Sequence, residues 1–491
     1  MKKFWPVQIV IFIIIIVIYW FSTTSYGMGV SPDSVCYLLT AESFSRYTSF
    51  FIDGHLQTHW PPGYPFVLGA LCKSIQTDSL LICARILNLL LLLLIAFSFR
   101  HILIKLSFGP VESYIFSFAF VLSHAVIFSS LMVWSEILFL WLLLCSYFFW
   151  LKFRSTNRIF YIILLGFFLG LMFMVRYAAL GIIGAYVILI ILQQNNVKEK
   201  IRQLVIVLLP SSMIILSWIF FVLNYHINAV DRHLSWHPAN IDQYIWGIKS
   251  ILMWFLPFRE KYVFIIILIL AGFIFAWLFI RERKKIVPCH AHQFKQLREW
   301  IIISVVYFLF IWVTVHFFDP LTDFNGRILL PVFPFIYLTL LWFSIKCIRR
   351  PYLAYLLAGL MILSGLRSAV FHYQNGYAFS GKDFEKSVSA LIPVIQNSHH
   401  KIISNAPEYL AFKFGYKPEY TDCTEMVITD RLIPAEQLLY QVKDSGAMII
   451  YFDAIKRKRF ISRDTLMQLF PSTYRHSFPG GMMIFNANPE M

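Results

Sequence analysis

The sequence predicts a polytopic α-helical membrane protein with a small α/β domain at its C-terminal end. Apolar residues make up 59% of the 491 residues and only 14% are charged, whereas soluble domains are close to a quarter charged. The mean hydropathy is +0.68. So few charged side chains cannot cover the surface of a soluble protein of this length. The same composition excludes a disordered chain.

The first element of this prediction is a set of about eleven membrane spans. Apolar runs of roughly 17–25 residues are long enough to cross a bilayer as helices. The runs are Val7–Phe21, Leu80–Phe99, Val111–Met132, Ile137–Leu151, Phe160–Val175, Leu180–Leu192, Leu204–Leu223, Val263–Ile280, Trp300–Val315, Ile328–Ile345 and Tyr352–Phe371. Two of them, 137–151 and 180–192, are short for a full crossing.

The basic residues give these spans an orientation. With the N-terminus inside, most Lys and Arg before residue 372 fall in the cytoplasmic connections, most densely in the segment 281–298. This is the positive-inside pattern, and an odd number of spans then places the C-terminus outside. The net charge of +16 is therefore explained by topology and by anionic lipid headgroups. Nucleic acid is not an expected partner.

The chain after the last predicted span has a different composition and predicts an extracytoplasmic α/β domain. We therefore divide the chain into a membrane domain, 1–371, with a long first outer loop at 22–79, and a tail domain, 372–491. The tail has no spanning run. Its patterns predict helices at 382–396, 407–414 and 434–444, strands at 401–404 and 448–452, and a hairpin of 474–478 with 482–485.

The seven cysteines do not predict a disulfide framework, because their number is odd and they are scattered. Cys83 lies in a predicted span, and only Cys36, Cys72 and Cys423 are expected to meet an oxidising compartment. The string Cys289-His290-Ala291-His292 lacks two further ligands nearby, so we interpret it as an ordinary polar loop rather than a metal site.

The first chemically informative string lies in the first outer loop. In Ser31-Pro32-Asp33-Ser34, Pro32 suits the first turn of a helix, which places Asp33 in that turn. Tyr37 follows four residues later and shares its helical face. The simpler alternative is that Asp33 is a helix cap at the membrane surface.

A second string in the same loop is His59-Trp60-Pro61-Pro62-Gly63-Tyr64-Pro65. Three prolines and a glycine argue against a regular helix here and favour a rigid, extended backbone. Trp60 and Tyr64 suit the headgroup region. The alternative is a purely structural loop at the membrane interface.

Ionisable residues gather at the outer edge of the predicted spans. Glu136 stands between two long apolar runs, and such a carboxylate is costly unless it faces a cavity or a partner. With Asp33 it supplies two carboxylates, which can divide base and electrostatic work or share a divalent metal ion. Arg176 and Arg327 stand at the same edge, and Arg85 and Arg367 lie about two turns in from it. Arginine suits phosphate, although any single one is also explained by snorkelling to the surface.

The order of these features resembles the GT-C membrane glycosyltransferases. It runs from one span through an Asp-x-x-x-Tyr helix (Asp33, Tyr37), a Trp-Pro-Pro-Gly-Tyr-Pro string and many spans to Arg-x-x-Leu-Pro-x-x-Pro from Arg327. The greatest similarity is to the protein-mannosyltransferase-like and aminoarabinose-transferase-like group, glycosyltransferase family 39 and its relatives. His237-Pro238 after Arg232, and Ser404-Asn405-Ala406-Pro407 in the tail, also look like this group. The layout is similar over about residues 1–371.

The chain departs from the pattern of these families at two positions. Many relatives have two adjacent acids where this chain has Asp33-Ser34, and many have Asp where it has Glu136. Both departures weaken the expectation of a metal cofactor, so we name none and leave a divalent ion at Asp33 and Glu136 open.

The resemblance implies the inverting transfer of one sugar, a hexose or pentose, from a polyprenyl-phosphate donor to an acceptor hydroxyl on the outer face of the cell (inner) membrane. Asp33 would be the base and Glu136 the second acid. The expected substrate-binding residues are Tyr37, His59, Trp60, Tyr64, Arg85, Arg176, Arg232, His237 and Arg327, with Arg327 the first choice for the lipid phosphate.

The expected partners are the lipid-linked donor, a protein, lipid or glycan acceptor, and membrane lipids. A transporter or lipid flippase, and an O-antigen-type polymerase or ligase, remain as alternatives. Transporters place ionisable groups near mid-membrane, whereas the acids here lie at the outer edge.

Overall fold

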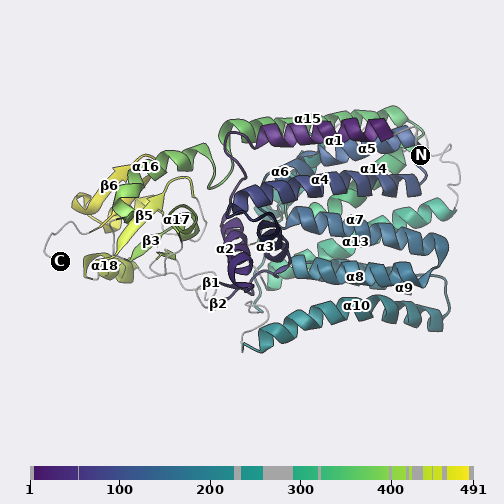
Figure 1. Cartoon of the computed structure of the whole chain (residues 1–491), viewed down its shortest axis with the longest axis horizontal. Helices are drawn as coiled ribbons and strands as arrows, with labels where there is room; N and C mark the ends of the chain where they lie inside the picture. Colours follow the sequence, from purple (N-terminus) through teal and green to yellow (C-terminus); the bar gives the residue numbers. More distant parts are fainter. Residues whose placement is uncertain are drawn as a thin grey trace.

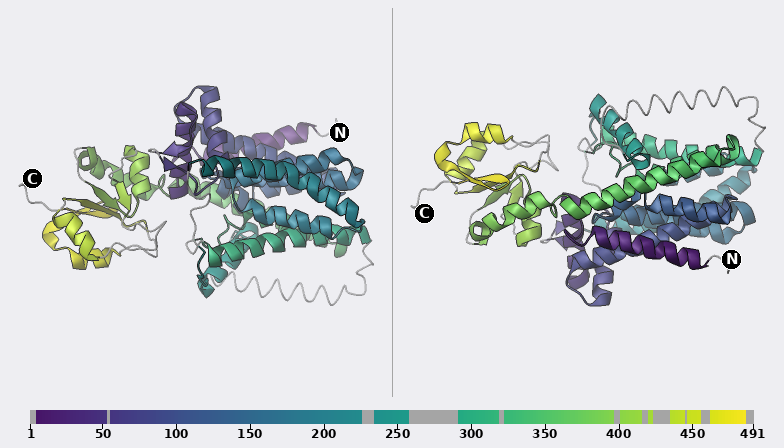
Figure 2. Two further views of the ribbon diagram at one scale, coloured as in Figure 1. Left: turned by 90° about the horizontal axis from the view of Figure 1, so that it is seen from below. Right: turned by 90° about the horizontal axis from the view of Figure 1, so that it is seen from above.

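The computed structural model describes residues 5–52, 55–225, 234–257, 291–318, 322–396, 401–415, 420–422, 435–444, 446–455 and 462–485. A bundle of long helices carries a small α/β unit at one end, and the N-terminus lies at the other end of the bundle (Figure 1). The views from the two other sides show the same division (Figure 2). The prediction of a mostly helical membrane protein with a small α/β unit is confirmed.

The bundle consists of apolar helices. Those described are α1 (Trp5–Ser22), α4 (Leu80–Lys105), α5 (Pro110–Val121), α6 (His124–Ser130), α7 (Glu136–Thr156), α8 (Ile159–Val175), α9 (Ala179–Ile191), α10 (Val197–Leu223), α13 (Ala291–Phe317), α14 (Phe333–Trp342, with short helical turns at 330–332 and 343–347) and α15 (Pro351–Asn375). In the described part of the chain, six helical segments are long and apolar enough to cross a membrane, or seven if a bent pair counts as one. The predicted span at 263–280 lies outside the described residues.

The predicted span over 111–132 is not one straight helix, because α5 and α6 meet at an angle of 52°. Ser123 ends one helix and begins the next, since its hydroxyl donates to the Phe120 carbonyl at 2.7 Å and accepts from the backbone N–H of Val126 at 3.4 Å. α15 packs closely at this break. A Cβ atom on Gly365 would lie only 1.7 Å from the Leu122 carbonyl oxygen, so the contact requires glycine.

Short helices cover the end of the bundle that faces the α/β unit (Figure 1). They are α2 (Pro32–Tyr47), α3 (Gly63–Ile75) and α11 (Ile241–Phe255), with the two-residue strands β1 (Phe51–Ile52) and β2 (His55–Leu56) after α2. The expectation that residues 59–65 form no regular helix is wrong for the last three of them. α3 begins at Gly63 and includes Pro65, because the first turn of a helix needs no hydrogen bond from its N–H groups. α11 was not predicted.

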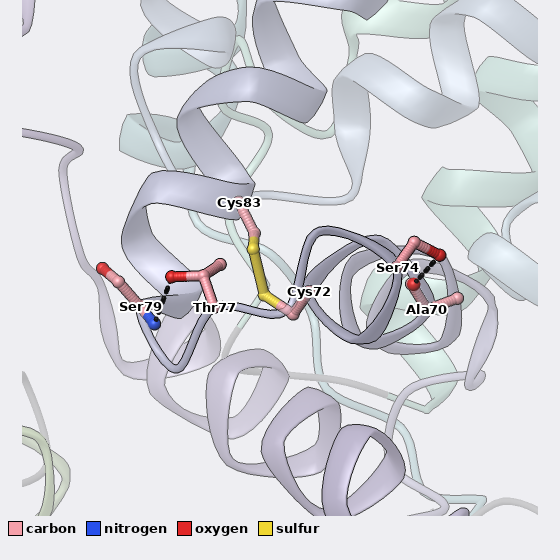
Figure 3. The surroundings of a disulfide bond; sticks show 6 residues. All are labelled: Ala70, Cys72, Ser74, Thr77, Ser79 and Cys83. Atoms are coloured by element: carbon pink, nitrogen blue, oxygen red, sulfur yellow. Dashed lines mark hydrogen bonds between the residues drawn. A yellow bond between two sulfur atoms is a disulfide. The ribbon is translucent and has the colours of Figure 1, made fainter.

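α3 and α4 are joined by a disulfide bond between Cys72 and Cys83, with Cα atoms 5.7 Å apart (Figure 3). The expectation of no disulfide is therefore wrong. Cys83 belongs to a predicted span, and within it the residue lies in the first turn of α4. That position is at the same end of the bundle as the α3 cysteine. The bond fixes α3 to the bundle, and α2 packs against α3 where Gly69 meets the Ala41 carbonyl.

The α/β unit follows α15. Its sheet has the strand order β4-β3-β5-β7-β6, in which β3 pairs in parallel with β4 and β5, and β7 pairs antiparallel with β5 and β6. The strands are β3 (Ile402–Ser404), β4 (Tyr420–Asp422), β5 (Met448–Phe452), β6 (Arg475–Phe478) and β7 (Gly481–Ile484), and the helices are α16 (Lys382–Gln396), α17 (Pro407–Phe414), α18 (Ala435–Lys443) and α19 (Arg463–Leu469). The predicted elements are confirmed with small shifts at their ends; β4 and α19 were not predicted.

The unit is in contact with the bundle. α17 packs against α2, and the backbone N–H of Phe379 donates to the Val30 carbonyl at 2.8 Å, just before α2 begins. The Ser404-Asn405 string is structural here. Asn405 is buried, donates to the Phe452 carbonyl at 2.9 Å and accepts from the Phe452 N–H at 2.9 Å, which ties β3 to the end of β5.

Candidate active site

Asp33 lies in the first turn of α2, as predicted. Ser31 is the N-cap, and a reciprocal pair of hydrogen bonds with Ser34 closes the capping box. Trp134 donates from its indole N–H to the Ser31 hydroxyl at 2.8 Å, which fixes this helix start to the segment before α7. Because Ser31 makes the cap, the carboxylate of Asp33 remains available for another partner. The helix-cap alternative for Asp33 is not what the structure contains.

Glu136 is the first residue of α7 and is buried, with 2% of its side chain exposed. The irregular segment before it is held in place by two backbone hydrogen bonds between Gly29 and residues Leu131 and Val133. The buried side-chain amide of Asn88 donates to the Ser130 and Met132 carbonyls at 2.8 Å each. These bonds satisfy backbone groups that would be costly to leave unpaired inside a membrane protein, and they fix where α7 begins.

Arg327 joins the two acids. Its NH1 atom lies 2.5 Å from Oδ2 of Asp33, and its Nε donates to Oε1 of Glu136. Arg176, the residue at the end of α8, donates to the same Oε1 atom. Four charged side chains from distant parts of the sequence thus form one charged cluster (Asp33, Glu136, Arg176 and Arg327). The Arg327 guanidinium also lies 4.6 Å from the centre of the Trp134 ring.

The turn that carries Arg327 is held from several sides. The Asn325 side chain accepts from the Ile328 N–H at 3.0 Å, and the Tyr307 hydroxyl donates to the Ile328 carbonyl at 2.9 Å. Gly326 lies against the Trp254 indole of α11, where a Cβ would come within 3.1 Å of Nε1. Helices α11 and α13 therefore help to position the guanidinium.

The two acids differ in access. Asp33 has 27% of its side chain exposed, against 2% for Glu136. Burial alone would raise the pKa of the Asp33 carboxyl, but the guanidinium of Arg327, which attracts and hydrogen-bonds the carboxylate, holds that pKa below its usual value. His59 and Arg176 act in the same direction. Asp33 is thus an ionised carboxylate that remains partly accessible.

Aromatic residues form one wall of the cluster. Tyr37 is buried, and its hydroxyl lies 3.2 Å from that of Ser135, the residue before Glu136. The ring of Tyr37 meets those of Trp60 and Tyr64 edge-on, with centroids 5.8 and 5.3 Å away. His59 packs on Trp60 at 4.4 Å. The structure therefore brings Tyr37, His59, Trp60 and Tyr64 together beside the acids.

Other predicted site residues lie elsewhere. Arg85 stacks on the Trp20 ring at 3.7 Å and donates to the Trp20 carbonyl at 3.0 Å, which is the snorkelling alternative for this residue. The ring of His237 hydrogen-bonds to the Ser235 hydroxyl, and the backbone N–H of His237 donates to the His316 carbonyl at 2.7 Å. Arg232 lies outside the described residues.

Sequence reasoning missed three contributors: Trp134, Ser135 and Ser31. They bond to or stack on the predicted residues rather than carry the charge themselves. The one available signal was their position one or two residues before Glu136 or Asp33.

The arrangement does not fit a divalent ion shared by Asp33 and Glu136, because the Arg327 guanidinium lies between the two carboxylates. Among the described residues, no three His, Cys, Asp or Glu side chains come together as a metal-binding group. The Cys289-His290 part of the polar loop lies outside the described residues.

No family model matches the chain, and no curated protein matches its sequence. In fold it is similar to ArnT from Cupriavidus metallidurans, in crystal structures of the apo state and of the protein bound to undecaprenyl phosphate. The TM-scores are 0.54 and 0.56 at 12% identity, covering 97% of both chains. Archaeal oligosaccharyltransferase AglB from Archaeoglobus fulgidus, in complex with an inhibitory peptide and a dolichol-phosphate, has a TM-score of 0.50 at 10% identity, over 92% of this chain and 70% of that one. Arabinofuranosyltransferase AftD from Mycobacteria has a TM-score of 0.53 at 12% identity, over 98% of this chain and 40% of that one. The chain has the GT-C fold, as its sequence predicted.

Proposed function

We propose that this protein is a membrane glycosyltransferase that moves one sugar from a polyprenyl-phosphate carrier to an acceptor hydroxyl on the outer face of the cell (inner) membrane, with inversion at the anomeric carbon. The observation that carries the proposal is the charged cluster, in which an accessible carboxylate and two guanidiniums meet at one end of a bundle with the GT-C fold. Nucleotide sugars are made in the cytosol, so sugar transfer outside requires a lipid-borne donor.

The proposed topology has eleven spans, the N-terminus inside, and the active site and α/β unit outside. The distribution of Lys and Arg supports it. The disulfide between Cys72 and Cys83 supports it independently, because it lies at the end of the bundle that carries α2 and α3 (Figure 1), and disulfides persist in oxidising compartments.

Asp33 is the base in this proposal, because it is the more accessible of the two acids. The acceptor hydroxyl gives its proton to the Asp33 carboxylate as its oxygen forms a bond to the anomeric carbon. The bond from the anomeric carbon to the carrier phosphate breaks, and its electron pair leaves with the phosphate. One displacement from the opposite side inverts the configuration.

Arg327 stabilises the leaving phosphate. A guanidinium has five N–H donors, of which those on Nε and NH1 face the two acids. Phosphate binding would draw Arg327 away from Asp33 and so release the base when the donor is in place. Glu136 holds both guanidiniums in position, so that their charge meets the negative charge that develops on the phosphate.

The aromatic wall of Tyr37, Trp60 and Tyr64 would shape the entrance for the lipid and the sugar. The acceptor is a hydroxyl of an envelope protein, lipid or glycan, and the sugar is a hexose or pentose. No step in this proposal passes through a metal ion.

The proposal is tested in cells that lack the gene. The outer-face glycans and glycolipids are compared by mass spectrometry after complementation with the wild type, with Asp33→Asn, or with Glu42→Gln. Glu42 is a matched control, because it lies on the same helix and pairs with Arg46, four residues later, at 2.9 Å on the surface. We expect one sugar mass to be absent from the deletion and the Asp33→Asn cells and restored by Glu42→Gln. Full restoration by Asp33→Asn would contradict the assignment of the base.

A further inference from the structure

The end of α8 supports two parts of the site at once. The helix ends at Arg176, whose backbone is extended, with φ −153° and ψ 133°. Side chains that follow one another on an extended backbone point to opposite sides. The side chain of Arg176 accordingly turns to Glu136 in the charged cluster, whereas that of Tyr177, the next residue, turns to the loop before α3.

The Tyr177 hydroxyl makes two hydrogen bonds. It donates to the Thr58 carbonyl at 2.9 Å and accepts from the indole N–H of Trp218 at 3.2 Å. Thr58 and Trp218 are both buried. The hydroxyl thus uses its one proton on the loop and accepts a bond from α10, which packs beside α8 at the edge of the bundle (Figure 1).

The loop that Tyr177 holds carries part of the aromatic wall. Thr58 comes directly before His59 and Trp60. The Trp60 ring meets that of Tyr37 at 5.8 Å, and the same loop brings His59 close enough to lower the pKa of Asp33. The position of this loop therefore decides where the wall stands beside the charged cluster.

The other end of the loop also rests on α8. Gly63, the first residue of α3, lies against the end of α8, where a Cβ atom would come within 2.5 Å of the Met174 carbonyl oxygen. Both ends of the segment 58–63 are thus held by the four residues that end with Tyr177. Arg176 belongs to the same four residues, so the loop and this guanidinium share one support.

The simplest alternative is that the Tyr177 hydroxyl only satisfies a buried carbonyl. An unpaired backbone carbonyl at a buried residue such as Thr58 is costly. This alternative predicts that removal of the hydroxyl lowers the stability of the protein. It predicts no change in how tightly the folded protein binds a ligand.

We propose that Tyr177 is a positioning residue for the polyprenyl-phosphate carrier. It fixes the distance between the loop at His59 and Trp60 and the guanidinium of Arg176, so that the aromatic wall receives the carrier while its phosphate meets the arginines. Tyr177 acts through the backbone of Thr58 rather than by contact with the carrier. The inference rests on the proposed function and adds the residue that joins the two parts of the carrier site.

The test measures the dissociation constant (Kd) of undecaprenyl phosphate for the purified full-length protein in detergent, by native mass spectrometry. Tyr177→Phe removes the hydroxyl and keeps the ring. Trp218→Phe removes the indole donor and leaves the bond to Thr58 in place, so it serves if Tyr177→Phe does not fold. The control is Tyr161→Phe, which removes a hydroxyl near the other end of α8, where the ring stacks on Phe149.

We expect the Kd to rise about tenfold in Tyr177→Phe, because a loop that is correctly placed in about one molecule in ten reduces the apparent affinity by the same factor. Trp218→Phe should raise the Kd in the same direction, by about threefold. Tyr161→Phe should keep the wild-type Kd.

Equilibrium unfolding of the same samples separates the positioning role from the simpler alternative. A Tyr177→Phe protein that is less stable but has the wild-type Kd would overturn the inference. An equal rise of the Kd in Tyr161→Phe, or no binding by the wild type, would overturn it too. Binding needs no sugar transfer, so failure of the proposed base would appear separately, as full restoration of the glycans by Asp33→Asn.

Discussion

Replacing Glu136 with Gln should destabilise the protein more than replacing Asp33 with Asn. Oε1 of Glu136 accepts hydrogen bonds from both Arg176 and Arg327, and the side chain is 2% exposed. Its removal leaves two guanidiniums without their shared buried partner. Arg176 then keeps a long contact of 3.4 Å to the Ser135 hydroxyl.

The expected loss of stability in each variant follows from how deeply the replaced carboxylate is buried. Breaking a buried ion pair by removing one partner lowers the free energy of unfolding by about 3–5 kcal/mol. The amide of Gln still accepts one hydrogen bond, so we expect the loss for Glu136→Gln to be close to the lower limit of this range. Asp33 is 27% exposed and has one guanidinium partner, so solvent reduces the loss to about 1 kcal/mol. We therefore expect a difference of about 2 kcal/mol between the two variants.

The assay is equilibrium unfolding of purified protein in mixed micelles, with Glu42→Gln as the control for loss of a surface ion pair. The expected order of stability is wild type and Glu42→Gln, then Asp33→Asn, then Glu136→Gln. If Glu136→Gln matched the wild type while Asp33→Asn were strongly destabilised, Glu136 would not be the buried anchor of the cluster.

Three other predictions concern the disulfide, the helix packing and the pH dependence. Cys72→Ser should lower the free energy of unfolding by about 3 kcal/mol, from the closure of a loop with a sequence separation of 11, and thiol labelling with and without reductant would show whether the bond exists in the wild type. Gly365→Ala should cost about 3 kcal/mol or prevent folding, because a backbone oxygen lies 1.7 Å from its Cβ position. Gly359→Ala on the same helix, with no atom within 4 Å, should leave the yield of folded protein unchanged. In the wild-type enzyme the lowered pKa of Asp33 should keep kcat/KM constant as the pH falls toward 3.8, the usual pKa of an Asp carboxyl. Arg176→Gln should raise the pKa of Asp33, so that kcat/KM begins to fall at a higher pH. If the pH at which kcat/KM falls did not change in this variant, Arg176 would not influence the base.

The parts of the fold that could be predicted are those with local signals. The Pro32 helix start follows from the backbone preference of a short string. The tail elements 382–396, 407–414 and 448–452 likewise follow from local patterns, and all match the structure to the residue. Long apolar runs gave the bundle helices for the same reason. The bend after Val121 was not predicted, although Ser123, which caps the second helix, is a local signal for it.

The four residues of the charged cluster could be predicted from the sequence, but which of them pair with one another could not. Asp33, Glu136, Arg176 and Arg327 stood out because charge at a membrane edge needs a partner. That one guanidinium joins both acids depends on contacts between residues that are at least 191 positions apart in sequence. Arg85 carried the same signal, yet it stacks on Trp20, and nothing local to its sequence separates the two outcomes.

The central claim is that Asp33 accepts the proton of the acceptor hydroxyl. The most direct measurement adds purified protein to membranes from deletion cells and follows two products together, the glycosylated acceptor and the free polyprenyl phosphate. For Asp33→Asn we predict that both appear at least about 100-fold more slowly than with the wild type, while Glu42→Gln keeps the wild-type rate. Equal rates for Asp33→Asn and the wild type would contradict the account.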